Sequence, residues 1–360
     1  MTKQPTILMM AAGTGGHIFP ALAVADELTA QGAKVHWLGT PNGMENTLVG
    51  ERYPMHHIDM QGLRGKGLAR LIKMPFMLYN ATSGAKNIIK NNEVDVVVGF
   101  GGYVTSAGGL AGKWAGKPLI IHEQNAIAGM SNKTLARFSD KVLQAFDSAF
   151  GANGITVGNP VRDAIDTVKS PDERYNVDDK SPLKVLVVGG SLGAKAINNA
   201  IVELLKTSDK PLSVKHQCGK DNHNEMLVAY SQAGIDTSKH TFQLMPFIDD
   251  MASVYAWADI VVCRAGALTV SEIASVGIGA IFVPLPHAVD DHQTFNAKSL
   301  TDKGAGILLP QPELSGAKLA QILNNLDREQ CLTMAKKAHE NAKHNVAKTV
   351  AEMVLASVKG

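Results

Sequence analysis

The sequence has few cysteines and no long apolar run. Its three cysteines, Cys218, Cys263 and Cys331, are odd in number, widely separated and without CxxC spacing, which argues against a disulfide framework or a zinc site and fits a reducing cytoplasm. No apolar stretch approaches the ~18 residues that a membrane-spanning helix requires. The apolar run at 7–12 leads directly into a glycine-rich turn and is too short for a signal peptide. We therefore expect any membrane contact to be peripheral.

The sequence also lacks the motifs of metal-dependent and nicotinamide-dependent enzymes. It has no Asp-x-Asp motif, and the histidines and carboxylates of 287–292 share one flexible polar loop with amide side chains that suit sugar hydroxyls better than a metal. The first glycine-rich turn lacks the third glycine of GxGxxG, and the second expected strand ends Gly39-Thr40 without a carboxylate to hold a nicotinamide ribose. We expect no metal, no cofactor and no hydride transfer.

The length and the pattern of the chain predict two domains. At 360 residues the chain is too long for one ordinary core. Short β-rich runs alternate with helical stretches, which predicts βαβ units and parallel sheets. The expected strands are 7–12, 35–39, 94–99, 119–122, 185–190, 213–217, 259–263 and 280–284.

An internal similarity places the second domain. The strand and glycine turn at 7–16 align with those at 185–194, so a second Rossmann-like domain should begin near residue 182. The predicted fold is α/β, with two Rossmann-like domains facing a deep cleft. We expect an N-terminal domain at 1–161, a C-terminal domain at 162–340, and a C-terminal helix in 341–360 that packs back on the first domain. The polar stretch 159–182, which contains three prolines, is the expected linker.

Three glycine-rich turns follow expected strands, at 13–17, 99–103 and 189–193. Glycine lets backbone N–H groups approach an anion, and the following helix N-terminus adds partial positive charge, so each turn is a candidate phosphate site. For any single turn the alternative is a tight connection without a ligand. Two such sites suit a reaction with a diphosphate on each substrate. In the first domain the candidate diphosphate residues are Gly13, Gly101, Gly102 and Tyr103.

The segment 264–272 follows an expected strand and opens a helix. Its N–H groups and Arg264 are suited to neutralise a diphosphate, and Glu272 is suited to accept both hydroxyls of a ribose. Alternatively, Ser271 and Glu272 only favour the first helical turn. In the loop and helix that follow, Gln293 and Asn296 are candidates for sugar hydroxyls.

His17 follows the first glycine turn. Histidine is suited to general-base catalysis near neutral pH, and this position lies at the ligand-binding edge of the expected sheet. A structural role is the alternative for a lone histidine.

Residues 60–92 contain no acidic residue, and basic side chains flank an apolar stretch there. Such a pattern is typical of a surface that docks on anionic lipid, where each charge contributes about 1 kcal/mol. An ordinary helix with a buried apolar face is the alternative. The candidate residues are Arg64, Lys66, Arg70, Lys73, Phe76 and Leu78.

A series of motifs resembles, in the same order, those of the MurG family of bacterial glycosyltransferases, in glycosyltransferase family 28. The resemblance runs from about residue 6 to the C-terminus. The motifs lie at 13–17, 100–103, 122–125, 158–162, 189–194, 264–272 and 292–297.

The resemblance implies the GT-B fold and one reaction. An inverting transferase, without a bound metal, would move GlcNAc from UDP-GlcNAc to the C4 hydroxyl of undecaprenyl-diphospho-MurNAc-pentapeptide, converting lipid I to lipid II for peptidoglycan. Ile248 would meet the uracil ring, and His17 and Glu123 would line the acceptor side as candidate catalytic residues. The residues implied to contact the donor are Thr14, Gly15, Gly16, Asn125, Arg162, Ser191, Ile248, Ala267, Leu268, Thr269, Val270, Ser271, Glu272 and Gln293.

The same resemblance implies partners and a location. The partners would be UDP-GlcNAc, lipid I, an anionic membrane surface and proteins of cell-wall synthesis and division, with no nucleic acid. The protein would lie peripherally at the cytoplasmic face of the inner membrane. Two other functions stay open at this point. They are a UDP-GlcNAc 2-epimerase, against which the basic apolar stretch argues, and a non-catalytic nucleotide-sugar sensor or scaffold.

Overall fold

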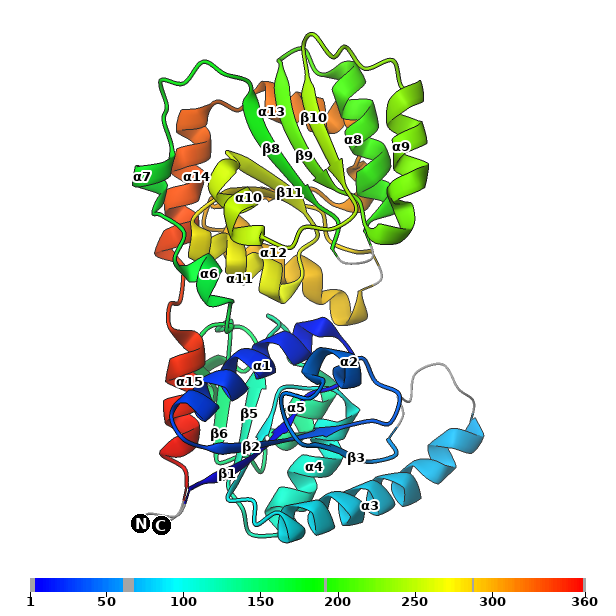
Figure 1. Cartoon of the computed structure of the whole chain (residues 1–360), viewed down its shortest axis with the longest axis vertical. Coiled ribbons are helices and arrows are strands. Elements are labelled where there is room, and N and C mark those ends of the chain that lie inside the picture. The colour runs from blue at the N-terminus through cyan, green and yellow to red at the C-terminus, as the bar shows by residue number, and fades with distance from the viewer. Residues whose placement is uncertain (1–3, 61–67, 191–192, 287, 359–360) are drawn as a thin grey trace. The chain divides into compact units, whose positions relative to one another are not determined.

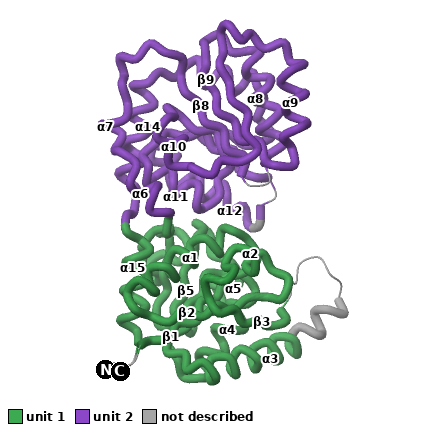
Figure 2. The backbone as a smooth tube through the Cα atoms, viewed as in Figure 1, with its two compact units in different colours: residues 1–161, 345–360 green, residues 162–344 purple. Residues whose placement is uncertain are grey.

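The computed structural model of the chain describes residues 4–60, 68–190, 193–286 and 288–358, without the side chains of 68–74 and 289. The chain divides into two compact units (Figure 2). Unit 1 comprises residues 1–161 and 345–360, and unit 2 comprises 162–344. Among the described residues, no helix is both long and apolar enough to cross a membrane.

Unit 1 is built on a seven-stranded sheet in the order β3-β2-β1-β4-β5-β6-β7. Every neighbouring pair of strands is parallel. The strands are β1 (Thr6–Met10), β2 (Lys34–Gly39), β3 (Met55–His57), β4 (Val96–Gly99), β5 (Leu119–Glu123), β6 (Lys141–Gln144) and β7 (Ile155–Thr156). The helices are α1 (Gly15–Ala30), α2 (Glu45–Val49), α3 (Leu68–Asn91), α4 (Tyr103–Trp114), α5 (Met130–Leu135), the short η1 (Gly151–Asn153) and α15 (Val346–Leu355).

Alternate residues of β1 show why the strands of this sheet are apolar throughout. Ile7 and Met9 pack on one face in a core that includes α1 and α15, and Leu8 and Met10 pack on the other face with α3 and α4. The helices of unit 1 can be followed around its sheet in Figure 1. A parallel sheet with helices on both faces buries every residue of its central strands. The sheet therefore presents its strand ends, rather than a face, to ligands.

Unit 2 repeats this plan with a six-stranded parallel sheet in the order β10-β9-β8-β11-β12-β13. The strands are β8 (Leu183–Val188), β9 (Leu212–Gln217), β10 (Thr241–Met245), β11 (Ile260–Cys263), β12 (Gly279–Phe282) and β13 (Gly306–Leu308). The α-helices are α6 (Asp163–Asp166), α7 (Pro171–Arg174), α8 (Lys195–Thr207), α9 (His223–Gln232), α10 (Met251–Trp257), α11 (Ala267–Val276), α12 (His292–Thr301), α13 (Gly316–Asn324) and α14 (Arg328–Glu340). The 3-10 turns are η2 (Lys220–Asn222), η3 (Val289–Asp291) and η4 (Gln311–Glu313).

The polar stretch expected as a linker is mostly part of unit 2. It forms α6 and α7, and Arg174 donates hydrogen bonds to the carbonyls of Val276 (2.9 Å) and Tyr255 (3.3 Å). The Tyr175 hydroxyl donates to the Asp259 carbonyl at 2.6 Å. The polar side chains of this stretch donate hydrogen bonds to backbone carbonyls of unit 2, and unit 2 begins at residue 162. The prediction of a linker that reaches residue 182 is therefore wrong.

The last helix, α15, belongs to unit 1 although the whole of unit 2 precedes it in the chain. Val346, Val350 and Val354 are buried in the same core as α1. Lys141 at the start of β6 donates to the Met353 carbonyl at 2.8 Å. Unit 1 is therefore completed by residues from both ends of the chain.

Candidate functional site

Two glycine turns meet at the carboxyl edge of the unit 1 sheet. Gly13 follows β1, and Gly101 and Gly102 follow the adjacent strand β4. The Phe100 N–H donates to the Met10 carbonyl at 2.8 Å, which holds the two strand ends together. Gly102 has φ +85°, and a Cβ placed there would lie 2.5 Å from the Ala12 carbonyl oxygen. Only glycine allows the two backbones to approach so closely.

The N–H groups of these turns differ in what they face. Gly13 N–H donates to Oε2 of Glu45 at 3.3 Å. Glu45 is fully buried, and its Oε1 also accepts from the backbone N–H and the hydroxyl of Thr40, both at 2.8 Å. Since the first N–H groups of a helix have no partner within that helix, the start of α4 at Gly102 and Tyr103 is better suited to a diphosphate than Gly13 is.

His17 lies in the first turn of α1, beside these turns. Its ring is partly buried, and Nδ1 lies 2.8 Å from Oε1 of Gln124, in the loop after β5. A Cβ at Gly101 would come within 2.9 Å of Cε1 and Nδ1 of the same ring. The structure therefore brings the predicted base and the predicted diphosphate residues to one edge of the sheet.

Glu123, at the end of β5, is only 1% exposed, and four donors surround its carboxylate. Oε1 accepts from the backbone N–H (3.0 Å) and side-chain amide (3.2 Å) of Asn125. Oε2 accepts from the Gly129 N–H at 3.0 Å and the Asn132 amide at 2.9 Å. A carboxylate satisfied in this way holds its loop in place, so the geometry favours His17 over Glu123 as the base.

Glu272 lies on α11 of unit 2 between two donors. The Tyr255 hydroxyl donates to Oε2 at 3.1 Å, and Arg162 Nη2 lies 3.5 Å from Oε1. Burial raises the pKa of the Glu272 carboxyl, and the Arg162 charge acts in the opposite direction. These two neighbours fix the orientation of the carboxylate. The helix that carries it, α11, begins after the carboxyl end of β11, and open α/β sheets bind ligands at this edge.

At the start of α11, the groups that a ligand can contact are mainly backbone N–H groups. Ala267 and Val270 are buried, so only their backbone can meet a ligand, whereas Leu268, Thr269 and Ser271 are partly exposed. The N–H groups of this first turn carry the partial positive charge suited to a diphosphate.

Arg264 has a different set of contacts from the one expected. Its guanidinium donates to the carbonyls of Val283 and Pro284, both at 3.1 Å, and to Oε1 of Gln311 at 2.6 Å. These bonds tie the end of β11 to the segments that follow β12 and β13. They favour a role in holding the strand ends and leave the neutralisation of a diphosphate to the N-terminus of α11.

The two amide side chains of α12 also differ. Asn296 is fully buried, and its amide donates to the Ala265 carbonyl at 3.2 Å, which fixes the loop before α11. Gln293 is partly exposed, and its Oε1 accepts from the Leu285 N–H at 2.9 Å. We therefore retain Gln293 for a sugar hydroxyl and assign Asn296 to the support of the loop.

The other donor residues are placed as follows. Ile248 is buried between β10 and α10, next to Phe247, whose ring is 43% exposed and lies 5.2 Å from Nζ of Lys220. Thr14 and Gly16 are exposed, and Gly15 is partly exposed, at the start of α1 in unit 1. Ser191 lies outside the described residues.

Sequence reasoning missed several residues of these sites. Tyr255 and Glu45 each contact a predicted residue from a distant position, and no local pattern marks them. Gln124 lies inside the motif 122–125, yet a buried glutamine carries no signal of its own. Among the described residues, no group of three or more His, Cys, Asp or Glu side chains could hold a metal ion.

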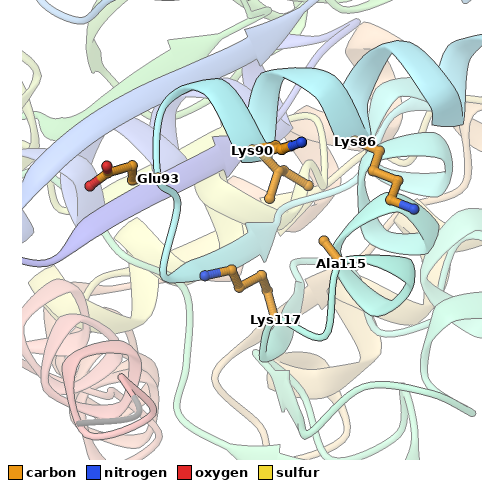
Figure 3. Close-up of a pocket in the computed structure, with 6 residues that line it drawn as sticks. Lys86, Lys90, Glu93, Ala115 and Lys117 are labelled. Atoms are coloured by element: carbon orange, nitrogen blue, oxygen red, sulfur yellow. The ribbon is translucent and has the colours of Figure 1, made fainter.

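A separate hollow of about 440 Å³ lies at the opposite edge of the unit 1 sheet (Figure 3). Lys86 and Lys90 reach it from the last turns of α3, and Ala115 and Lys117 face them from the end of α4 and the loop before β5. Because Lys117 precedes the amino end of β5, this hollow is not part of the site built from the glycine turns.

Two α/β units, each built on a parallel sheet, with glycine turns at strand ends and a helix N-terminus that precedes the partly buried carboxylate of Glu272, define a nucleotide-sugar glycosyltransferase of the GT-B class. The sequence matches the Glycosyltransferase family 28 N-terminal domain over residues 7–144 and the C-terminal domain over 184–351. The chain belongs to glycosyltransferase family 28 and, within it, to the MurG family.

Relatives and solved structures support this assignment over the whole chain. A Psychrobacter arcticus protein is 58% identical over 358 residues, covering 98% of this chain and 99% of that protein. An Acinetobacter baylyi protein is 47% identical, covering 98% and 97%. Both are named UDP-N-acetylglucosamine--N-acetylmuramyl-(pentapeptide) pyrophosphoryl-undecaprenol N-acetylglucosamine transferase.

The crystal structure of Acinetobacter baumannii MurG is 44% identical, with a TM-score of 0.88 and coverage of 98% of this chain and 99% of that chain. The calicheamicin glycosyltransferase CalG4, at 15% identity and a TM-score of 0.67 over the full length of both chains, shares the fold.

Proposed function

We propose that the chain transfers GlcNAc from UDP-GlcNAc to the MurNAc of undecaprenyl-diphospho-MurNAc-pentapeptide, the step that converts lipid I to lipid II. The observation that carries this function is the 58% identity, over 98% of the chain, to a relative that is named for this transfer. The comparisons do not support the epimerase or the non-catalytic sensor.

The proposed chemistry is a direct displacement. The C4 oxygen of the acceptor forms a bond to the anomeric carbon of GlcNAc as the bond from that carbon to the diphosphate of UDP breaks, and the configuration inverts. The acceptor proton passes to His17 Nε2, and UDP leaves with the electron pair of the broken bond. Charge that grows on the diphosphate is stabilised by fixed N–H dipoles, which need no reorganisation during the step. We assign these dipoles to the first turn of α11.

The overall reaction has a direct test. Purified chain would be incubated with labelled UDP-GlcNAc and a lipid I analogue in the presence of a chelator, and UDP and glycosylated product would be measured together. We expect one UDP for each product. Formation of an epimer without acceptor, or tight UDP-GlcNAc binding without any transfer, would overturn the proposal. Loss of transfer in chelator would contradict only the metal-free chemistry.

Glu272 gives a first prediction about the donor site in unit 2. Replacing Glu272 with alanine removes a charged acceptor for the two ribose hydroxyls. Hydrogen bonds to charged groups contribute roughly 1.5–3 kcal/mol, so we expect about 10- to 100-fold weaker UDP-GlcNAc binding. Calorimetry with UDP-GlcNAc alone measures this change independently of the acceptor.

A matched control uses another carboxylate of the same unit. Glu225 pairs with Lys195 at 3.1 Å on the surface of unit 2. Glu225→Ala should leave donor affinity within about twofold, since exposed ion pairs contribute little to stability. The assignment of Glu272 fails if both variants bind UDP-GlcNAc as tightly as the unmodified chain.

We also propose that unit 1 binds a membrane surface through α3 and the end of α4. Phe76 and Tyr79 on α3 are 68% and 59% exposed, and Trp114 at the end of α4 is 53% exposed. The rings of Tyr79 and Trp114 lie 6.4 Å apart. Aromatic rings exposed together in this way suit the boundary between water and lipid.

The basic and apolar residues predicted for this surface differ in their exposure, and the structure describes the side chains of only some of them. Leu78 is only partly exposed and packs against the core, so we do not include it in the proposed patch. Arg70 and Lys73 lie on α3, but their side chains, like the whole of Arg64 and Lys66, are outside the described residues. Lys86 and Lys90 are exposed on the same helix.

A second prediction tests this surface with vesicles. Changing Phe76, Tyr79 and Trp114 together to serine should lower partitioning onto anionic phospholipid vesicles by about tenfold or more, because a buried apolar side chain contributes roughly 1.5–3 kcal/mol. Phe138→Ser, at a ring of unit 1 that is 44% exposed, is the matched control and should bind as before. Equal binding by the triple variant would rule this surface out.

A further inference from the structure

A chain of hydrogen bonds leads from His17 into the interior of unit 1. His17 Nδ1 lies 2.8 Å from Gln124 Oε1, and Gln124 Nε2 lies 3.1 Å from His122 Nδ1 and 3.0 Å from the His122 carbonyl oxygen. His122 Nε2 lies 2.8 Å from the Gly158 carbonyl oxygen. Gln124 and His122 are 1% and 0% exposed, so solvent does not compete for these groups.

The inner end of the chain fixes the proton on His122. The Gly158 carbonyl can only accept, so His122 Nε2 must carry a hydrogen. Burial lowers the pKa of His122 to about 4, although the hydrogen bond to Gly158 and the charge of Glu123 act in the opposite direction. His122 is therefore neutral near pH 7, and its Nδ1 is an acceptor.

The orientation of the Gln124 amide follows from its two inner contacts. Both the His122 carbonyl and the neutral His122 Nδ1 are acceptors, so the group that faces them must be the NH₂ of the amide. The amide oxygen then faces His17. Asn159 donates to the Gln124 carbonyl at 2.9 Å and holds the backbone of this residue. The network leaves Gln124 with one favourable orientation.

We propose that Gln124 is a positioning residue that selects the tautomer of His17, with the proton on Nδ1 and the lone pair on Nε2. An amide oxygen can only accept, so His17 Nδ1 must donate to it, and the neutral ring then presents Nε2 as a base. This inference rests on the proposed function for its catalytic consequence, but the tautomer itself does not.

The same arrangement bears on the fate of the proton. After Nε2 takes the acceptor proton, the His17 imidazolium still donates from Nδ1 to a neutral amide, which cannot accept the proton in turn. Gln124 therefore orients the ring without adding a charge. The backbone of Gly101 lies close to the His17 ring. Packing against this backbone and the hydrogen bond to Gln124 therefore both restrict the orientation of the ring.

The tautomer can be measured directly on the full chain. Two-bond proton–nitrogen spectra of nitrogen-15 histidine-labelled protein distinguish Nδ1–H from Nε2–H rings, and His17→Asn and His122→Asn variants assign two of the 12 histidines. We expect His17 protonated on Nδ1 and His122 on Nε2. A His17 ring protonated only on Nε2 would overturn the proposal, whether or not the protein is active.

Variants of Gln124 then connect the tautomer to turnover. Gln124→Leu should shift His17 toward Nε2–H and lower kcat about 10- to 100-fold, within the range that one general base contributes, while the KM for UDP-GlcNAc changes less than about twofold. Gln124→Glu supplies an oxygen acceptor toward His17 again and should restore Nδ1–H, whereas its second oxygen then faces the two His122 acceptors and should lower the stability of unit 1. Its pH–rate profile should move to higher pH on the acid side, because a carboxylate favours the imidazolium.

A matched control separates positioning from general damage to unit 1. Gln144, at the end of β6, is also 1% exposed, and its amide donates to the Gly151 carbonyl at 3.0 Å. Gln144→Leu should destabilise unit 1 as Gln124→Leu does, yet leave the tautomer of His17 and kcat nearly unchanged. Unchanged kcat in Gln124→Leu, or equal losses in both variants, would contradict the role of Gln124. Absence of transfer in the unmodified chain would instead count against the proposed function.

Discussion

Replacing His17 with alanine is expected to lower kcat for transfer to a lipid I analogue by about 10²- to 10⁴-fold, the usual contribution of a general base. The side chain lies at the strand-end edge of unit 1, beside the turns proposed for the acceptor diphosphate. The residues proposed for the nucleotide, Glu272 and Arg162, are in unit 2. The affinity for UDP-GlcNAc should therefore stay within about twofold. Steady-state kinetics with varied acceptor, together with calorimetry for the donor, measures the two effects separately.

The control for this variant is another histidine of unit 1. His57 is exposed on β3 and pairs with Oδ1 of Asn46 at 2.7 Å, so His57→Ala should turn over normally. If His17→Ala and Glu272→Ala lost nucleotide binding to the same extent, the assignment of His17 to the acceptor and of Glu272 to the donor would be wrong.

Acidification is expected to remove a large part of the stability of both units between pH 6.5 and about 4. Burial lowers the pKa of His122 in unit 1 and of His216 in unit 2 to about 4 each, whereas an unfolded histidine titrates near 6.5. The unfolded chain therefore binds more protons in this window, and stability falls as the pH falls. The contribution is fully present above pH 6.5, and each histidine accounts for about 3 kcal/mol at the acid end.

Urea unfolding at a series of pH values tests this expectation. His216 is held by the Tyr230 hydroxyl at 2.8 Å and by Asn198 at 3.0 Å, and His216→Gln keeps a polar group there without a titrating one. This variant should lose less stability between pH 6.5 and 4.5 than the unmodified chain does. Parallel losses in the two proteins would assign the acid sensitivity to carboxylates instead.

The sequence allowed the central strands to be predicted more reliably than the outer ones. All eight expected strands are present, because strands covered on both faces must be apolar throughout, as in Val96–Gly99. The unpredicted strands include β3, β7, β10 and β13, which are short or only partly buried. Such strands lie at or near sheet edges, where one side meets solvent and the apolar pattern is lost.

The sequence allowed the residue types of the candidate site to be predicted, but not the hydrogen-bond partners of those residues. Glycine turns identified the strand ends because close backbone approach requires glycine, as at Gly102. The partners of Arg264 could not be predicted, since Val283, Pro284 and Gln311 are distant in sequence and only the folded chain brings them to it. The donors to Glu123 are close in sequence, but no local pattern shows that they turn toward its carboxylate. The charge of Arg264 suggested that it binds a diphosphate, but in the structure its guanidinium donates to backbone carbonyls instead. Gln124 could be interpreted only once the atoms on both sides of its amide were known.

The placement of α15 has a consequence for biosynthesis. The ribosome makes α1 early, but α15, which packs against it, emerges only after all of unit 2 has been translated. Domains generally fold as units in the order of synthesis, whereas here all of unit 2 can be made before unit 1 has its last helix. Until α15 is made, the core of unit 1 lacks Val346, Val350 and Val354, so we expect this unit to complete its core after unit 2.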